Sequence, residues 1–380
     1  MTAGVSKLHF WGQRDRPLTP SELAERLPII GTGKAPKELL EFQKHSLYVA
    51  TSGRLKQPLI ETTKVSREGD STFWRIDLAE DKDQKVTQLL GKTKIREQPE
   101  KIRAAIDPKV DFTGHRPDWS HLFYIPRTLP RTSAGRMRRF NGRFVDPAYV
   151  FGPDDRQVYQ DQSYPWRCVG KVFNNEGKVG SGALVWPNIM VTAGHMVPWS
   201  SSSWWMRFVP DYFDGQSLLG AGVESNVSDV QGYNASYYSG SPTGYDWAIC
   251  KLYNPIGNAL GYFGYNTYSS DWENWNVWTV VGYPLAVASG ERPSWQGGIS
   301  ILDDDEDSND GQELESETAD ITGGNSGGPI FGWWSGDPRV IGVVSGTESE
   351  YRFLQGHQDN NIFASGSGVA NLIGWGRSNW

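Results

Sequence analysis

From residue 155 onward, the sequence is a series of short apolar runs, each closed by turn-forming residues. Short runs separated by Gly, Pro, Asn and Asp are typical of strands, and a chain with many of them forms an all-β sandwich or barrel. The candidate strands cover residues 168–173, 182–186, 189–193, 246–252, 277–283, 298–302, 329–334 and 339–345. Residues 369–375 predict a short terminal helix.

Charge and aromatic content divide the 380-residue chain into two units. Residues 1–143 hold 27 Lys and Arg against 17 Asp and Glu, a net charge of +10, whereas residues 144–380 hold 10 against 27, a net charge of −17. Of the 17 Trp, 14 lie in the second unit. We therefore predict two units of different character, whose opposite charges favour docking of one on the other.

The first unit, residues 1–143, is predicted to be a polar, mixed α/β segment without recognisable chemistry. Residues 20–27 resemble a helix start, with Thr19 as its cap. Residues 37–47 repeat apolar side chains at helical spacing, and residues 72–78 alternate like a strand. The four histidines of this unit lack metal-ligand spacing.

Residues 127–143 form a basic segment that contains six arginines. It is compatible with a nucleic-acid or membrane patch, a solvated loop, or an exposed linker cut by a protease. Its position at the boundary in charge and composition favours the linker. We therefore expect neither nucleic acid nor a membrane as a partner.

The two cysteines, Cys168 and Cys250, are too few for a disulfide scaffold, and two buried thiols are as compatible with the sequence as one bridge. No apolar run has the length of a membrane span, and charged residues interrupt any signal-peptide core near Met1. The second unit nevertheless has an extracellular composition. It also contains Asn226-Val227-Ser228 and Asn234-Ala235-Ser236, which fit glycosylation acceptors. We expect an extracellular protein.

The stretch Thr322–Pro329, with the sequence TGGNSGGP, displays a serine between glycines. Glycine adopts positive φ without steric cost and allows a ligand to approach the backbone. Ser326 is therefore a candidate nucleophile, and the N–H groups of Gly324 and Ser326 are a candidate oxyanion hole. The plain alternative is a glycine-rich turn with an incidental serine.

Two further residues complete a candidate catalytic set. His195 follows an apolar strand that ends in small residues, and Asp246 begins another apolar strand. A serine hydroxyl needs a histidine to take its proton, and the histidine needs a carboxylate to orient it. Singly, His195 fits a core histidine and Asp246 a turn residue. Together with Ser326, in the chain order His-Asp-Ser, they predict a triad.

These motifs resemble those of the trypsin/chymotrypsin-like serine proteases, in the glutamyl-endopeptidase-like branch. The supporting stretches are 153–158, 281–284, 294–299, 340–343 and 361–364. The resemblance covers about residues 150–375. It implies two perpendicular six-stranded β-barrels with a C-terminal helix and the site between the barrels. A propeptide is usual ahead of the protease in this branch.

The sequence departs from its relatives beside both the serine and the histidine. Asn325 stands where trypsin-like enzymes carry the aspartate that pairs with a new N-terminal amine, so trypsin-style activation is not expected. Met196 follows His195 where many relatives have a cysteine, and Ser181 stands near the usual partner position. The disulfide beside the histidine is therefore absent.

The residues that line the specificity pocket also differ. Ile321 and Val344 stand where glutamate-specific relatives place a threonine and a histidine, and neither side chain can donate a hydrogen bond to a carboxylate. Asp320 stands where trypsin selects basic residues, although some glutamate-specific relatives direct such an aspartate away from the pocket. Basic and apolar preferences are therefore favoured equally, and glutamate least. By the same resemblance, Ser345 should hydrogen-bond Asp246.

Two other features are interpreted structurally. The acidic run 303–307 lacks the glycine and terminal glutamate of a calcium-binding loop, and a solvated hairpin is the better interpretation. The tryptophan pairs 204–205 and 333–334 fit sugar or peptide binding less well than packing between strands and loops.

The sequence thus predicts a serine endopeptidase made as a zymogen, with a propeptide over residues 1–143 and a protease domain over residues 144–380. Its expected partners are protein or peptide substrates and its own propeptide, and no cofactor or metal is needed. Two rivals stay open: a non-catalytic secreted binding protein on a protease-like fold, and an esterase with the same triad. The chain order His-Asp-Ser differs from the order Ser-Asp-His of α/β-hydrolases.

Overall fold

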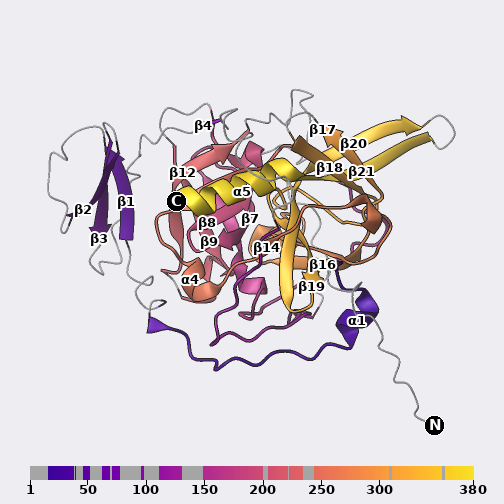
Figure 1. Cartoon of the computed structure of the whole chain (residues 1–380), viewed down its shortest axis with the longest axis horizontal. Coiled ribbons are helices and arrows are strands. Elements are labelled where there is room, and N and C mark those ends of the chain that lie inside the picture. Colours follow the sequence, from indigo (N-terminus) through magenta and orange to yellow (C-terminus); the bar gives the residue numbers. More distant parts are fainter. Residues whose placement is uncertain are drawn as a thin grey trace, which may run out of the picture.

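The computed structural model describes residues 16–37, 39, 46–51, 62–68, 71–77, 96–97, 111–130, 149–199, 204–220, 222–233, 244–307, 310–352 and 356–380. Most of this part of the chain is β-structure in two large sheets, with a long helix at the C-terminal end (Figure 1). The predicted all-β class is confirmed.

The first large sheet closes into a six-stranded antiparallel barrel. Its strands pair in the order β13-β8-β7-β6-β9-β12, and β12 pairs again with β13. They are β6 (Val169–Asn174), β7 (Val179–Trp186), β8 (Ile189–Thr192), β9 (Met206–Pro210), β12 (Ser225–Gly232) and β13 (Ala248–Leu252). Val172, Leu184 and Ile249 are fully buried in its core. Burying each such side chain contributes roughly 1.5–3 kcal/mol.

The second large sheet curls into a ring whose two outer strands, β16 and β17, are consecutive along the chain. Its strands pair in the order β17-β18-β21-β20-β19-β15-β16. Because β16 runs on into β17 after three residues, and the Leu302 N–H donates to the Glu315 carbonyl, the two ends of this order meet. The strands are β15 (Trp278–Gly282), β16 (Ser294–Ile299), β17 (Asp303–Asp307), β18 (Gly311–Ser316), β19 (Pro329–Trp334), β20 (Asp337–Arg352) and β21 (Gly356–Ser365).

The second ring encloses its own apolar core, whereas the C-terminal helix contacts β13 of the first barrel and β18 of the second ring. Trp278, Ile330 and Phe363 are fully buried in this ring. The predicted terminal helix is present as α5 (Ser367–Asn379), which is longer than residues 369–375. Its apolar side chains at helical spacing, such as Val369 and Ile373, are buried.

Short elements lie before and between the strands of the two rings. They are β5 (Gln157–Val158), β10 (Tyr212–Phe213), β11 (Gln216–Ser217), β14 (Gly264–Tyr265), α4 (Gly257–Leu260) and the 3₁₀ turns η1 (Trp166–Cys168), η2 (Gly194–Met196), η3 (Ser270–Trp272) and η4 (Ala288–Gly290). β5 extends the second sheet beside β16, and β14 pairs with β20. Among the described residues, no helix combines the length and apolarity needed to cross a membrane.

The N-terminal residues form separate small elements. Helix α1 (Pro20–Ala24) begins at a capping box, in which Thr19 Oγ1 accepts from the Glu22 N–H and Glu22 accepts from the Thr19 N–H. Strands β1 (Ser46–Thr51), β2 (Thr62–Glu68) and β3 (Ser71–Asp77) form one sheet in the order β1-β3-β2. β3 matches the strand predicted over residues 72–78. Most of the helix predicted over residues 37–47 lies outside the described residues.

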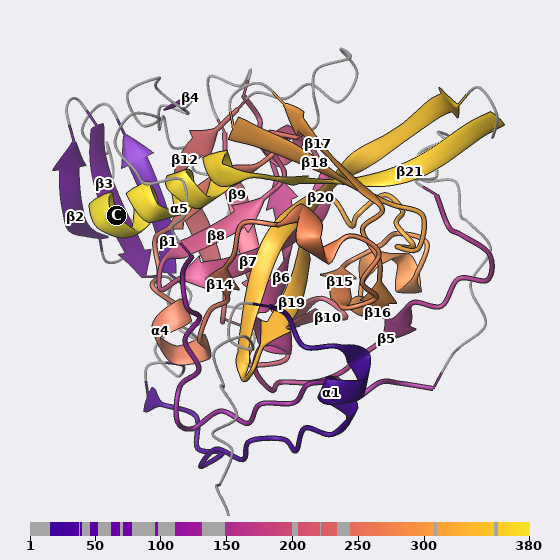
Figure 2. The same cartoon turned by 45° about the vertical axis from the view of Figure 1, so that its right-hand side comes forward.

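Residues 111–130 lie along the two rings rather than apart from them (Figure 2). Phe112 and Tyr265 exchange backbone hydrogen bonds, and so do His115 and Tyr262. Leu122, which is 1% exposed, pairs with Ile29. In addition, β4 (Arg96–Glu97) pairs in parallel with β12.

Candidate active site

His195 and Asp246 meet through two hydrogen bonds. His195 lies in η2, directly after the buried strand β8, and Asp246 lies just before β13, which pairs with β8. The His195 N–H donates to Asp246 Oδ1 at 2.8 Å, and His195 Nδ1 lies 2.7 Å from Asp246 Oδ2. Because a carboxylate oxygen accepts hydrogen bonds, Nδ1 is the donor in this contact, and Asp246 does not engage the other ring nitrogen, Nε2.

Ser345 supplies a third hydrogen bond to the same carboxylate. Its Oγ donates to Asp246 Oδ2 at 2.7 Å, as the sequence resemblance implied. Asp246 is 3% exposed and Ser345 is 2% exposed, so water does not compete freely for these contacts. The carboxylate is fixed from both large sheets, because Ser345 lies in β20.

The turn that carries Ser326 depends on its glycines. Gly324 has φ +97°, and a Cβ there would lie 2.4 Å from the Tyr283 carbonyl oxygen. Gly327 has φ +78°, and a Cβ there would lie 2.2 Å from Thr192 Oγ1. Only glycine tolerates both the positive φ and the close approach.

Ser326 is held from both rings through its backbone. Its carbonyl accepts from the Ser181 N–H of β7 at 2.8 Å, and the next amide, Gly327 N–H, donates to the Val344 carbonyl of β20 at 2.8 Å. A Cβ at Gly180 would lie within 3 Å of both Met196 Sδ and the Ser326 carbonyl oxygen, so the serine turn lies beside the residue that follows His195.

The candidate nucleophile and oxyanion donors of the turn are unpaired within the described part of the chain. The Ser326 hydroxyl has no hydrogen-bond partner there, so the Ser326–His195 hydrogen bond is not formed in this conformation. Such bonds are often loose in the absence of substrate. The Gly324 and Ser326 N–H groups also have no acceptor among the described residues, and this is the state that an oxyanion hole requires.

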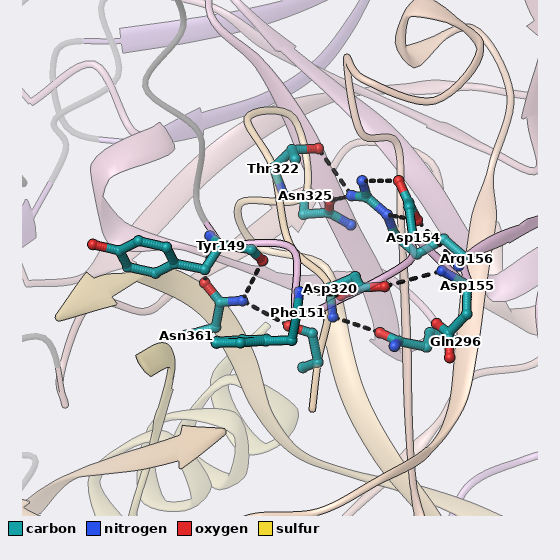
Figure 3. Close-up of polar contacts among 11 residues, drawn as sticks. Tyr149, Phe151, Asp154, Asp155, Arg156, Gln296, Asp320, Thr322, Asn325 and Asn361 are labelled. Carbon is teal, nitrogen blue, oxygen red and sulfur yellow. Dashed lines mark hydrogen bonds and ion pairs between the residues drawn. The ribbon is translucent and has the colours of Figure 1, made fainter. Parts of the chain in front are cut away.

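Asp320, a candidate specificity residue, has both of its carboxylate oxygens engaged by backbone N–H groups. It is 1% exposed, its Oδ1 accepts from the Phe151 N–H at 2.8 Å, and its Oδ2 accepts from the Asp155 N–H at 3.1 Å (Figure 3). Burial raises the pKa of its carboxyl group, whereas the two backbone N–H donors lower it. This geometry matches an aspartate that is directed away from the pocket.

Ile321 and Val344 belong to the apolar core of the second ring. They are 2% and 1% exposed and pack in the same cluster as Ile341 and Phe363. Neither offers a polar hydrogen to a substrate carboxylate.

Arg156 contacts the serine turn and is a residue that the sequence left without a role. Its Nη1 donates to Thr322 Oγ1 at 2.9 Å and to Asn325 Oδ1 at 3.2 Å (Figure 3). Asp154 pairs with the same guanidinium, with Nη2 to Oδ2 at 2.7 Å. The stretch 153–158 supports the family resemblance and was the available signal, but sequence spacing does not connect it to residue 325.

The two cysteines do not form a disulfide. Cys168 and Cys250 are both free and buried, and burial raises the pKa of the Cys168 thiol to about 12.

Ser181, which stands near the position of a disulfide partner in relatives, makes two hydrogen bonds instead. Its Oγ accepts from the Tyr283 N–H at 2.9 Å and donates to the Gly324 carbonyl at 2.8 Å. A serine thus links β7 to the serine turn.

The acidic run forms a hairpin, as predicted, because β17 pairs with β18. Among the described residues, Glu273, Asp303 and Asp304 are the one group of three His, Cys, Asp or Glu whose ligand atoms lie within 4.8 Å of one another. The tryptophans 204, 333 and 334 are buried, and Trp333 packs against Tyr124 at 4.7 Å between ring centroids. These three rings therefore serve packing.

The fold and the candidate site define the class of this protein. The Trypsin family model matches residues 155–356, which is more than half of the chain, so the chain belongs to that family. The resemblance to trypsin-like serine proteases of the glutamyl-endopeptidase-like branch is confirmed.

Two curated relatives are similar over part of the chain. A glutamyl endopeptidase of Bacillus licheniformis is 29% identical over 48% of this chain and 54% of its own length. An extracellular metalloprotease of Bacillus subtilis is 28% identical over 40% of this chain and 49% of its own length. The chain thus spans about half the length of both relatives. A solved structure of a Glu endopeptidase in complex with MPD has a TM-score of 0.46 and 20% identity, covering 60% of this chain and all of that one.

Proposed function

We propose that this protein is a serine endopeptidase made as a zymogen. Residues 1–143 are the propeptide, the basic stretch 127–143 is the linker cut on activation, and residues 144–380 are the protease domain. The family match and the two peptidase relatives support hydrolysis of peptide bonds. We also propose an extracellular location, because the second relative is named an extracellular protease.

The reaction follows from the roles of three side chains. His195 Nε2 takes the proton of the Ser326 hydroxyl, Ser326 attacks the peptide carbonyl, and the Gly324 and Ser326 N–H groups bind the oxyanion. His195 then donates the proton to the leaving amine, and water hydrolyses the acyl-enzyme. Asp246 orients the imidazole and stabilises its charged form throughout. This sequence of steps needs no cofactor.

One observation carries the proposal. Asp246 accepts hydrogen bonds from His195 Nδ1 and Ser345 Oγ, and the strand that carries Ser345 also binds the serine turn through the Val344 carbonyl. A serine-directed phosphonate should label Ser326 in the wild type, and mass spectrometry identifies the labelled residue. Ser326→Ala should keep the fold and lose turnover, apart from the low residual rate that substrate binding and the oxyanion hole still provide. Normal turnover in that variant overturns the proposal.

We further propose that the residue before the scissile bond is apolar rather than acidic or basic. Ile321 and Val344 offer a carboxylate no donor, and both Asp320 oxygens accept from backbone N–H groups. A peptide library should be cleaved mainly after apolar residues. Efficient cleavage after glutamate, the preference named for the first relative, would contradict this proposal.

The rival function is that of a non-catalytic binding protein on the same fold. An intact His195–Asp246 pair favours the enzyme, and an absence of phosphonate labelling would favour the rival. An esterase would label but would leave peptide substrates intact. Self-processing separates these functions further. If the wild type is cut within residues 127–143 during incubation and Ser326→Ala stays whole, the protein is a protease that matures itself.

A further inference from the structure

One short stretch of chain holds the wall on which the serine turn rests. We name residues 149–156 the clamp segment, because each end and the middle of it bind residues 319–325. Figure 3 shows the contacts of its middle and of Arg156. At one end, the Tyr149 carbonyl accepts from the Ile321 N–H at 3.1 Å. In the middle, the clamp segment donates two backbone N–H groups to Asp320. Two of the three contacts are thus made by backbone atoms.

The other end of the clamp segment makes its contact through a buried cation. The Arg156 side chain is 2% exposed and is paired with Asp154, which is 27% exposed. Its remaining Nη1 donors go to Thr322 and Asn325 in the serine turn. A planar guanidinium serves these partners together because its donors are fixed in one fork.

Asn325 transmits this contact to the reactive amides. Its Oδ1 accepts from Arg156 and from the Thr322 N–H at 3.2 Å, and it is 1% exposed. Its own backbone N–H donates to the Thr322 carbonyl at 3.0 Å, and its carbonyl accepts from the Gly328 N–H at 2.7 Å. Asn325 lies between Gly324 and Ser326, the two residues whose N–H groups are unpaired. Displacing it therefore moves both oxyanion donors.

We propose that Arg156 is a positioning residue for the oxyanion hole, acting through Asn325. Trypsin-like enzymes carry an aspartate at the Asn325 position, and a new N-terminal amine pairs with it. Arg156 replaces that amine as the cation that binds this position. The cation belongs to the unbroken chain, so the serine turn is held in its reactive shape before the linker is cut. This inference rests on the proposed function and adds to it a means of activation that requires no new chain terminus.

The test measures how fast a small diphenyl alkylphosphonate labels Ser326 in the full chain, by intact mass, at several pH values. Arg156→Met retains the apolar stem and removes the guanidinium. It should be labelled about 100-fold more slowly, the size of effect that follows loss of an oxyanion donor. The pH dependence of labelling should stay unchanged, because His195 is untouched. On a small ester substrate, kcat should fall while KM stays near the wild-type value.

Two further variants separate positioning from a general loss of folding. Asn325→Leu, of similar shape, should be labelled as slowly as Arg156→Met, and the double variant should be no slower than either single one, because both remove the same contact. Arg292→Met breaks an exposed ion pair with Asp214 elsewhere and should react like the wild type. Thermal unfolding of every variant checks the fold.

Three outcomes overturn the inference. The first is a folded Arg156→Met that reacts within about threefold of the wild type. The second is a double variant whose loss is the product of the two single losses. The third, which decides the matter if Arg156→Met does not fold, is a folded Asn325→Leu that reacts normally. A wild type that is unlabelled both before and after linker cleavage instead overturns the proposed function itself.

Discussion

Two glycines with similar backbone angles differ in what surrounds them. Gly324 and Gly177 have φ +97° and +76°, but a Cβ at Gly324 would lie 2.4 Å from the Tyr283 carbonyl oxygen, whereas a Cβ at Gly177 would meet nothing within 4 Å. Positive φ costs an alanine about 1–2 kcal/mol at either site. Only at Gly324 must the backbone also move.

We therefore predict that Gly324→Ala and Gly177→Ala have different effects on activity. Both variants should lose about 1–2 kcal/mol of unfolding free energy from the positive φ, and Gly324→Ala more because of the clash. Only Gly324→Ala should lose catalysis, by about 100-fold or more in kcat, because the displaced amide is one of the two proposed oxyanion donors. Peptidase assays and urea unfolding measure the two quantities. Equal activities would show that this amide does not bind the oxyanion.

Asp320 gives a prediction about pH. Burial raises the pKa of its carboxyl group above the ordinary 3.8, so the folded protein binds this proton more tightly than the unfolded chain does. Its contribution to stability is therefore fully present below the ordinary pKa and is lost as the pH rises through the raised value. Asp320→Asn lacks this titration. As the pH falls from neutral to about 4, the melting temperature of the wild type should rise relative to that of the variant.

Scanning calorimetry of both proteins over that pH range measures the difference. A constant difference in melting temperature would mean that Asp320 has the same pKa in the folded and unfolded chain. The variant should also cleave a peptide library with the wild-type preference, because the carboxylate binds the backbone of Phe151 and Asp155 rather than substrate.

At the scale of elements, the contact between β7 and the serine turn depends on one hydroxyl. Ser181→Ala leaves the Tyr283 N–H and the Gly324 carbonyl without this partner in a buried site. We predict a loss of about 1–3 kcal/mol, the cost of unsatisfied buried groups, together with lower activity. Ser378→Ala is the matched control, because its hydroxyl also bonds a carbonyl but is exposed. Equal losses in urea unfolding would contradict the role of Ser181.

A strand could be predicted from the sequence where an apolar run coincides with the residues that pair in the sheet, and not elsewhere. β8 and β19 are such runs, whereas β12 has the polar sequence SNVSDVQG and gave no signal. The strand expected over residues 298–302 was wrong, because β16 covers Ser294–Ile299 and includes Gly298 at φ +73°. Pairing with β15 over residues 294–299 outweighs the local apolar run.

The same limit applies to the candidate site. Spacing and residue type predicted His195, Asp246 and Ser326, since each has a distinctive local motif. Arg156 could not be predicted in this way, because its contact with Asn325 joins residues 169 positions apart. The orientation of Asp320 also depends on Phe151, which carries no sequence signal of its own.

At the scale of the whole molecule, the proposed propeptide is joined to the protease by more than the linker. Trp119 Nε1 donates to the Ala259 carbonyl, and Trp166 Nε1 donates to the Phe123 carbonyl. Arg377 lies over the Phe112 ring at 4.3 Å from its centroid. These contacts add to the backbone pairing of residues 111–130 with the rings.

We predict that cutting the linker does not release the N-terminal fragment. Limited trypsin digestion of Ser326→Ala within residues 131–143 should give two chains that elute together at the size of the intact protein. Native mass spectrometry should detect both chains in one complex, and denaturant should separate them. Separation without denaturant would show that residues 111–130 do not hold the cut protein together.

The clamp segment also bears on where a recombinant enzyme should begin. The family match begins at residue 155, so an expression plasmid designed from that match would encode Arg156 but neither Phe151 nor Asp154. The translated product would then have a buried arginine without its carboxylate and an Asp320 without one of its two donors. A start codon placed ahead of Tyr149 retains both of these partners and the Tyr149 carbonyl that accepts from the Ile321 N–H.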